Sequence, residues 1–162
     1  MKVNLNDVVI TKIDINDETS ILEIANWFDS WYEWPKPKWT KNKIIKRIKD
    51  YAVSKFGAKM YVAKYNNNVV GTVALLKYDD TKKSSKLSPW IANAYIKQDY
   101  RKNGIYKKLL NELYEEAKSN NIEKLYLWTD WENLYEDMGF NYCGKIKIDD
   151  GSTQRLYCYE LK

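Results

Sequence analysis

Histidine is absent from this 162-residue chain, and its absence excludes several kinds of active site. Nucleophilic catalysis by Ser-His or Cys-His pairs needs an imidazole, and histidine is also the commonest metal-ligating side chain. We therefore expect no metal site. Any acid–base step must use Asp, Glu, Tyr, Lys, Cys or water.

Cysteine is scarce, and long apolar runs are missing. Cys143 and Cys158 are the two cysteines; they do not form a C-x-x-C metal motif, and two residues make a poor disulfide framework. No stretch of eighteen apolar residues predicts a membrane-spanning helix, and the start "MKVNLNDVVITK" lacks the apolar region of a signal peptide. These features predict a cytoplasmic protein with reduced cysteines and no membrane partner.

With three prolines and six glycines, the chain has no segment that resembles a linker, and it shows no internal repeat. Its hydrophobic content of 44% is enough for a core, so we expect one domain over residues 1–162. The net charge of +5 is uneven. Eight bases and one acid lie between Lys41 and Lys64, which leaves −2 for the rest. A solvated helix face is the favoured interpretation, and a nucleic-acid surface is the alternative.

Hydrophobic periodicity predicts the element order β-α-α-β-β-β-α-β-α-β-β. The strands at 89–96 and 124–129 flank a helix at 103–119, so they should be parallel with a right-handed crossover. Most other pairings are hairpins, one of them signalled by Asn66–Asn68 and one by Asp149–Gly151. The predicted fold is α/β of the α+β kind, with a mixed, mostly antiparallel central sheet flanked by helices.

The segment "QDYRKNGIYKKLL", residues 98–110, places a helix start after a turn-forming Asn-Gly pair. Helix starts favour acids because the positive end of the helix dipole lies there. Here four bases take the acids' place: Arg101, Lys102, Lys107 and Lys108. The free amides of such a start suit phosphate oxygens, and Gly104 lets the backbone come close. A tight turn with incidental bases is the plainer alternative.

The longer segment "PWIANAYIKQDYRKNGIYKKLL" resembles the coenzyme A motif of the GCN5-related N-acetyltransferases, Arg/Gln-x-x-Gly-x-Gly/Ala. Residues 101–106 fall on that motif, and the element order is also that of the family. "LYLWTDWENLYEDMGF" is similar to the family's next segment, in which a tyrosine precedes Gly-Phe on a short helix. Tyr106 departs from the motif's Gly/Ala, so its side chain must point away from the pyrophosphate or the loop must shift.

The resemblance implies the acyl-CoA N-acyltransferase fold and an enzyme that transfers acetyl from acetyl-CoA to a primary amine of a small molecule or protein. Tyr135 would protonate the leaving thiolate, unless it is only a core aromatic. The residues implied to bind the cofactor are Ala94, Tyr95 and Ile96 along the strand, Arg101, Lys102, Asn103, Gly104, Ile105 and Tyr106 in the loop, and Asn133 beyond it.

The general base and the acceptor site are less defined. "WIANAYI" has no carboxylate where many family members place a glutamate, so Asp130 is the first candidate base, before Asp79, Glu33 or a water chain. The segment "ANWFDSWYEWPKPKW" would supply an aromatic wall for a cationic amine. Its predicted substrate-binding residues are Trp27, Trp31, Tyr32, Glu33 and Trp34. Alternatively, Trp27 belongs to the core and Trp34 anchors the loop.

Two other functions are compatible with the sequence. One is a regulatory relative that binds coenzyme A without turnover. The other is a nucleic-acid or anion-binding module using the Lys41–Lys64 face. The second is disfavoured because Ile44, Ile48 and Tyr51 fall on the inward face of their helix, which leaves few aromatics among the bases. A homodimer is possible, since family members often dimerise.

Overall fold

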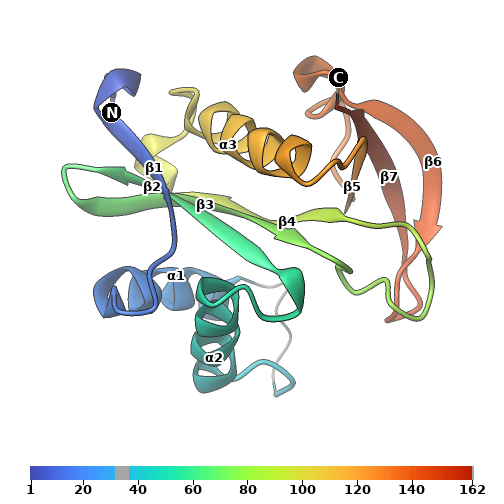
Figure 1. The fold of residues 1–162 in the computed structure, drawn as a ribbon, viewed down its shortest axis with the longest axis horizontal. Coiled ribbons are helices and arrows are strands. Elements are labelled where there is room, and N and C mark those ends of the chain that lie inside the picture. The colour runs from blue at the N-terminus through green and yellow to red at the C-terminus, as the bar shows by residue number, and fades with distance from the viewer. Residues whose placement is uncertain (32–36, 162) are drawn as a thin grey trace.

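A computed structural model describes residues 1–31 and 37–161, and it arranges them in three layers (Figure 1). The middle layer is a seven-stranded sheet in the order β1-β2-β3-β4-β5-β7-β6. Helix α3 covers one face, and α1 and α2 cover the other. The bounds are β1 (Val8–Lys12), α1 (Glu18–Ser30), α2 (Lys41–Ala52), β2 (Lys59–Tyr65), β3 (Asn68–Leu76), β4 (Trp90–Ile96), α3 (Ile105–Ser119), β5 (Lys124–Thr129), β6 (Asn141–Lys147) and β7 (Thr153–Glu160).

Strand pairing confirms the predicted mixed sheet. The pair β4–β5 is parallel, as the crossover through α3 requires, and the other pairings among the described strands are antiparallel. Each face of the sheet has its own buried cluster: Leu109 and Leu113 of α3 on one side, and Phe28 of α1 with Ile48 of α2 on the other. No helix among the described residues combines the length and apolarity needed to cross a membrane.

The helix starts follow from capping side chains. Asp17 accepts a hydrogen bond from the Ser20 amide at 3.1 Å, and Thr40 accepts one from the Lys43 amide at 3.4 Å. Each cap satisfies an amide that the first turn leaves without a helical partner. The sequence predicts one helix with Asp17 as its N-cap and a second from about Thr40, and the structure confirms both starts.

Two predictions about helices are wrong. The short helix expected before Gly139 is a single 3-10 turn, Glu136–Met138, because Asn133 adopts a left-handed φ of 63° that an α-helix does not accommodate. The spacing that places Ile44, Ile48 and Tyr51 on the inward face of the second helix also predicts Phe56 there. That helix ends at Ala52, and Phe56, with a φ of 57°, is 83% exposed.

The β2–β3 connection is shorter than predicted. Asn68 already belongs to β3, so the turn consists of Asn66 and Asn67, with φ values of 50° and 62°. Positive φ at both positions defines the type I′ turn, whose twist matches that of a hairpin. Asparagine tolerates this conformation better than most residues, which explains its presence at both positions.

The expectation that both cysteines are reduced is also wrong for this structure. Cys143 of β6 and Cys158 of β7 form a disulfide, with their Cα atoms 6.2 Å apart. The two strands pair as a hairpin with an irregularity between Tyr142 and Lys145, and this brings the cysteines together across the ladder. The spacing of two cysteines in a sequence does not reveal such a pairing, because it depends on the strand register.

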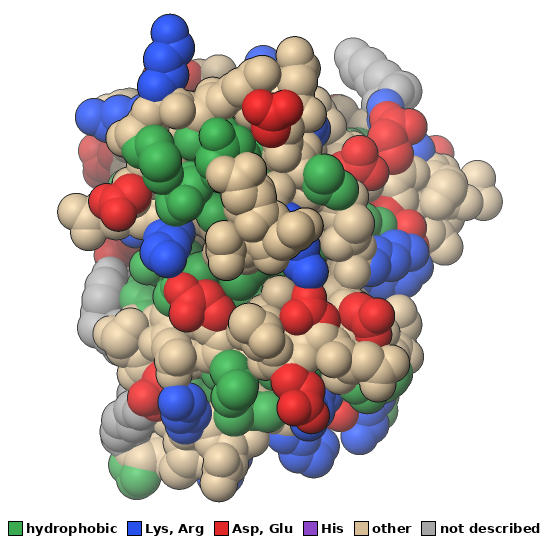
Figure 2. Space-filling view, turned by 90° about the vertical axis from the view of Figure 1, so that its left-hand side faces the viewer, with side chains coloured by type: hydrophobic (Ala, Val, Ile, Leu, Met, Phe, Trp, Pro, Cys, Tyr) green, Lys and Arg blue, Asp and Glu red, His purple; other side chains and the backbone are tan. Residues whose placement is uncertain are grey.

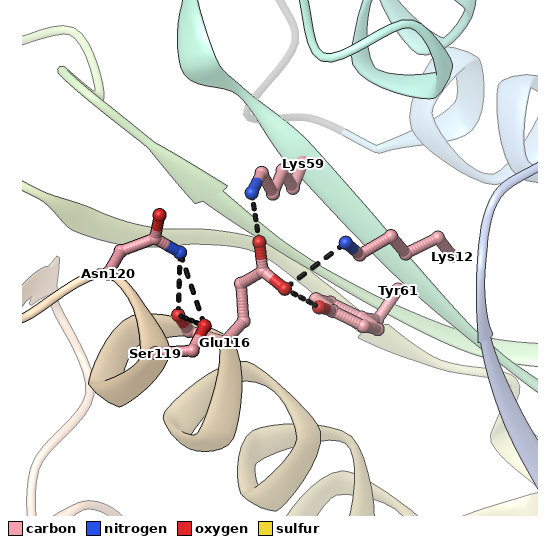
Figure 3. A network of polar contacts seen from close by, with 6 residues as sticks. All are labelled: Lys12, Lys59, Tyr61, Glu116, Ser119 and Asn120. Atoms are coloured by element: carbon pink, nitrogen blue, oxygen red, sulfur yellow. Dashed lines mark hydrogen bonds and ion pairs between the residues drawn. The ribbon is translucent and has the colours of Figure 1, made fainter.

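A carboxylate on α3 ties this helix to the edge of the sheet (Figure 3). Glu116, 14% exposed in its side chain, forms ion pairs with Lys59 and, at 3.1 Å, with Lys12, and it accepts a hydrogen bond from the Tyr61 hydroxyl at 3.0 Å. The hydrogen bond from Lys59 is the main reason that the pKa of Glu116 falls from its ordinary 4.5 to about 2. The cluster thus joins α3 to β1 and β2 through charge.

We predict that this cluster makes stability depend on pH. The folded pKa of Glu116 lies below its unfolded value, so its contribution is complete above about pH 4.5 and is lost as pH falls toward 2. Urea unfolding should show that the wild type loses about 1–2 kcal/mol more than Glu116→Gln between pH 7 and pH 3, after allowance for solvent screening. An equal loss in the two proteins would contradict a stabilising role for Glu116.

Candidate functional site

The parallel strands β4 and β5 pair at one position and then separate. Trp90, the first residue of β4, pairs with Tyr126 of β5, and no further β4–β5 pairing follows in the described chain. The carboxyl ends of both strands, Ile96 and Thr129, lie beyond this point. One edge of β4 therefore lacks a strand partner there, and a row of backbone donors and acceptors remains open to a ligand.

An irregularity in β4 accompanies this separation. The register with β3 shifts between Thr72 and Ala74, and Asn93 adopts a left-handed φ of 51°. The bulge is anchored from both sides. The Thr72 hydroxyl donates to the Asn93 carbonyl at 2.9 Å, and the Tyr51 hydroxyl of α2 donates to the Asn93 side-chain oxygen at 3.1 Å. Bulges of this kind bend a strand and re-aim its side chains.

Behind Asn93, a polar chain leads to the surface of α2. The Arg47 Nε donates to the Tyr51 hydroxyl at 2.9 Å, and the Arg47 guanidinium lies 5.7 Å from the centre of the Trp39 ring. Burial raises the pKa of Tyr51, so this phenol keeps the proton that it donates to Asn93. The residue pattern alone did not identify this chain, because its contact between Tyr51 and Asn93 joins residues 42 apart in the sequence.

The loop from Arg101 to Gly104 carries the helix start that the sequence singled out. Gly104 is the N-cap of α3 and has a left-handed φ of 79°. Because glycine has no side chain, no side-chain hydrogen bond caps this helix. The Asn103 amide closes the turn that precedes α3, and among the described residues none accepts a hydrogen bond from the amides of Lys102 and of residues 104–107. These amides can therefore bind an anion, with the positive end of the helix dipole behind them.

The side chains of the loop serve mainly to hold it in place. The Asn103 side chain donates to three carbonyl groups, those of Met1, Tyr100 and Arg101, at 3.0–3.1 Å, and it accepts from the Val3 amide at 2.9 Å. Arg101 turns back to β4, where its Nε donates to the Ile96 carbonyl at 2.9 Å. Asn103 and Arg101 thus leave the backbone as the main donor surface.

The lysines of α3's first turns differ in their surroundings. Lys108 donates to the carbonyls of Leu5 and Val8, at 3.0 and 2.5 Å, and so ties α3 to the N-terminal segment. Lys102 and Lys107 are exposed. The positive charge available to an anion from outside is therefore concentrated on these two lysines.

The structure brings Tyr135 to the start of α3. Its hydroxyl lies 3.3 Å from that of Tyr106, and the two rings meet edge to face with centroids 6.4 Å apart. Both side chains are partly buried and pack on the core beneath α3. Tyr106 therefore faces Tyr135 and the core, which is one of the two arrangements that the sequence required of a large side chain at this position.

Beside Tyr135, a network of side chains holds the 3-10 turn against the sheet. The Tyr157 hydroxyl of β7 donates to Glu136 at 2.7 Å and accepts from Arg155 at 3.1 Å. Arg155 also lies 3.5 Å from Glu132 and 4.3 Å from the centre of the Tyr142 ring. Hydrogen bonding from Tyr157 lowers the pKa of Glu136, so the carboxylate that anchors the turn stays ionised.

On the opposite face, the predicted acceptor aromatics meet β4. Trp27 stacks on Tyr95 with centroids 4.9 Å apart, and Trp31 lies 6.0 Å from the same ring. Trp27 is a core residue, 8% exposed, as the alternative reading of this segment held. Three predicted substrate-binding residues lie outside the described residues: Tyr32, Glu33 and Trp34.

Two of the remaining predicted residues lie beyond the open end of β5. Asp130 follows β5 directly and is exposed, as is Asn133, so both lie at the end where β4 and β5 have separated. Asp79 is in the β3–β4 connection, where its carbonyl accepts a hydrogen bond from the Trp128 indole at 2.7 Å. No three His, Cys, Asp or Glu side chains of the described chain are grouped so as to hold a metal ion.

Comparison with known proteins shows which family the chain resembles in sequence and which solved structures share its fold. The model of the acetyltransferase (GNAT) family matches residues 21–140. An aminoglycoside 6′-acetyltransferase type Ii is similar in structure, with 16% identity, a TM-score of 0.72, and coverage of 95% of this chain and 97% of the other. A search of curated proteins found no match.

Two further solved structures share the fold. PaiA N-acetyltransferase from Thermoplasma acidophilum, in complex with coenzyme A, has 19% identity and a TM-score of 0.68, with 94% and 98% of the two chains covered. An acetyltransferase of the GNAT family from Staphylococcus aureus Mu50 has 21% identity and a TM-score of 0.67, with 96% and 99% covered. At these identities the likeness establishes the fold.

Proposed function

Because this chain belongs to the acetyltransferase (GNAT) family, we propose that it transfers the acetyl group of acetyl-CoA directly to a primary amine of a small molecule or protein. The observation that carries the proposal is the start of α3. Its amides at residues 102 and 104–107 lack acceptors within the described chain and follow the strand that separates from its parallel neighbour. A diphosphate and an extended pantetheine arm match these two features in charge and shape.

The loop would bind the pyrophosphate mainly through its backbone. The Gly104 conformation brings the amides to one side of the turn, and Lys102 and Lys107 add positive charge. Hydrogen bonds to charged groups contribute roughly 1.5–3 kcal/mol each, so several together are enough for micromolar affinity, about −8 kcal/mol. Ala94, Tyr95 and Ile96 would lie along the pantetheine. An amide of this strand would polarise the thioester carbonyl.

Acetyl-CoA would supply the electrophilic carbonyl and the thiolate that leaves. Tyr135 would donate its hydroxyl proton to the sulfur. Phenols have a pKa of about 10 and thiols of about 8.5, so the phenol is protonated at neutral pH and the transfer is modestly uphill. The network of Tyr157, Glu136 and Arg155 supports this assignment, because it anchors the turn next to Tyr135.

An ammonium acceptor must lose a proton before it attacks. Asp130 is exposed at the open end of β5 and is our first candidate for this base, with water as the alternative. The acceptor itself would approach from the α1 side, where Trp27 and Trp31 meet Tyr95. A cytoplasmic location and a homodimer, both expected from the sequence or the resemblance, stay predictions.

The nucleic-acid alternative fits the structure less well. Four of the eight bases between Lys41 and Lys64 form ion pairs with carboxylates: Lys46, Lys55, Lys59 and Lys64. Of the aromatics in this segment, Tyr51 and Tyr61 are buried, and Phe56 alone is exposed. Figure 2, which views the left-hand side of Figure 1, shows basic and acidic side chains interspersed on that face. Steeply salt-dependent DNA binding without any effect of acetyl-CoA would favour this alternative.

The proposal predicts that acetyl-CoA stabilises the protein and is consumed. A ligand at a hundred times its Kd adds about 2.7 kcal/mol, which should raise the melting temperature by several degrees. A thiol-release assay over a panel of primary amines then measures transfer. Stabilisation without thiol release across the panel would favour the regulatory alternative. The absence of both stabilisation and thiol release would contradict the proposal.

We predict that Gly104→Val weakens acetyl-CoA binding about tenfold or more by calorimetry. A side chain at φ +79° is strained by roughly 1–2 kcal/mol, so the loop must leave its binding conformation. Gly57→Val is the matched control, because Gly57 has a φ of +74° with open space around it and lies in the turn Lys55–Gly57, away from the loop. Equal affinity in both variants would argue against the loop as the pyrophosphate site.

For Tyr135→Phe, we expect turnover to fall by about two orders of magnitude, the lower range for loss of a general acid. The Kd for acetyl-CoA should stay within about twofold, because the loop amides of residues 102–107 are untouched. Steady-state kinetics and calorimetry on the same preparation separate the two effects. Unchanged turnover would remove Tyr135 from the mechanism.

A further inference from the structure

Tyr106 occupies an unusual place for a residue of the phosphate loop. It is the second residue of α3, yet its hydroxyl reaches the hydroxyl of Tyr135, 29 residues further along the chain, at 3.3 Å. The distance is longer than the 2.7–2.8 Å that is common between hydroxyls, as is usual for catalytic contacts without substrate. The edge-to-face ring contact fixes the mutual orientation of the two side chains.

The surroundings of this pair are mostly aromatic. Tyr135 also packs against Phe140 and against Tyr157 of β7, with centroids 5.3 and 5.7 Å away. Tyr114 lies about two turns further along α3, and burial raises its pKa. Such a site strengthens a hydrogen bond to any charge that develops within it, because little water competes there.

The charged groups around the pair come from three elements. Glu136 follows Tyr135 in the chain and is held by Tyr157 and Arg155 of β7. Lys107 of α3 and Asp137 of the 3-10 turn line the cleft between these two elements. A label on the tyrosines themselves separates the titration of the pair from that of these groups.

We propose that Tyr106 is a positioning residue that donates a hydrogen bond to the Tyr135 oxygen, and so supports Tyr135 when it acts as the acid for the leaving thiolate. This inference rests on the proposed function. As the thioester C–S bond breaks, Tyr135 gives its proton to the sulfur, which keeps the bonding electron pair. The Tyr135 phenolate then accepts the Tyr106 hydrogen bond until the proton released by the acylated amine restores it through water.

The direction of the hydrogen bond follows from burial. Burial, together with the neighbouring Tyr135, raises the pKa of Tyr106 well above its ordinary 10, so Tyr106 keeps its proton while Tyr135 gives its own away. A donor aimed at a developing phenolate favours the charged form of that group. Tyr106 thus lowers the cost of proton transfer from Tyr135 without touching the sulfur itself.

The test compares Tyr106→Phe with Tyr114→Phe in the full-length protein. Both variants remove one phenol hydroxyl from the same helix, but the described contacts of Tyr114 are with the Tyr159 ring, 4.3 Å away, and not with the Tyr135 hydroxyl. Tyr106→Phe is expected to lower kcat about three- to tenfold with the Kd for acetyl-CoA within twofold. Tyr114→Phe should leave both unchanged.

A second readout separates a positioning role from a packing role. The loss of one hydrogen bond to the phenolate should move the ionisation of Tyr135 to higher pH by about one pH unit in Tyr106→Phe, and the alkaline fall in kcat should move with it. The resonances of ¹³Cζ-labelled tyrosine report this directly, with Tyr135 assigned by its loss in Tyr135→Phe. A merely structural role of Tyr106 leaves both titrations in place.

The outcomes are distinguishable from failure of the proposed function. An unmoved Tyr135 titration in Tyr106→Phe, or equal kinetic loss in Tyr106→Phe and Tyr114→Phe, would overturn the inference. A wild-type protein that transfers acetyl to no amine would overturn the function, and with it the acid role, while the NMR comparison still decides whether the hydroxyls are paired.

Discussion

The separation of two parallel strands is the constraint on which the rest of this molecule depends. β4 and β5 pair at Trp90 and Tyr126, and from there the sheet divides into two parts that share no further ladder in the described chain. A sheet that stayed paired would satisfy its own backbone groups and leave nothing for a ligand. The bulge at Asn93, held by Thr72 and Tyr51, bends β4 at the place where its partner leaves it.

The start of α3 complements this opening. Amides in the segment 102–107 form the donor surface. The side chains around them hydrogen-bond elsewhere: Asn103 binds the N-terminal segment, Arg101 donates to the Ile96 carbonyl, and Lys108 donates to the carbonyls of Leu5 and Val8. A loop held from three directions presents its amides without further ordering, which reduces the entropy that binding would cost. Under the proposed function, the loop would bind its anion more through the backbone than through the bases.

Each face of the sheet carries its own cluster of aromatic residues near the proposed site. Under α3, Tyr106, Tyr135 and Tyr157 join the helix, the 3-10 turn and β7 in one cluster. On the α1 face, Trp27 and Tyr95 stack over β4. The strand between the two clusters is the element that cofactor and acceptor would share, so a change in the packing of either face is transmitted to the same few residues of β4.

Residue patterns were sufficient for the element order, the parallel crossover and the position of the glycine-capped start of α3, because periodicity, capping residues and an Asn-Gly turn act over a few neighbouring residues. They were insufficient for the disulfide between Cys143 and Cys158, for the 3-10 turn that replaces a helix, and for the partner of Tyr106. The sequence alone determined that the large side chain of Tyr106 stands where the family's motif has Gly or Ala, so it cannot be accommodated there as a small side chain would be. Only the tertiary structure decided that it turns to Tyr135, because contacts across 29 residues depend on how α3 packs against the turn after β5.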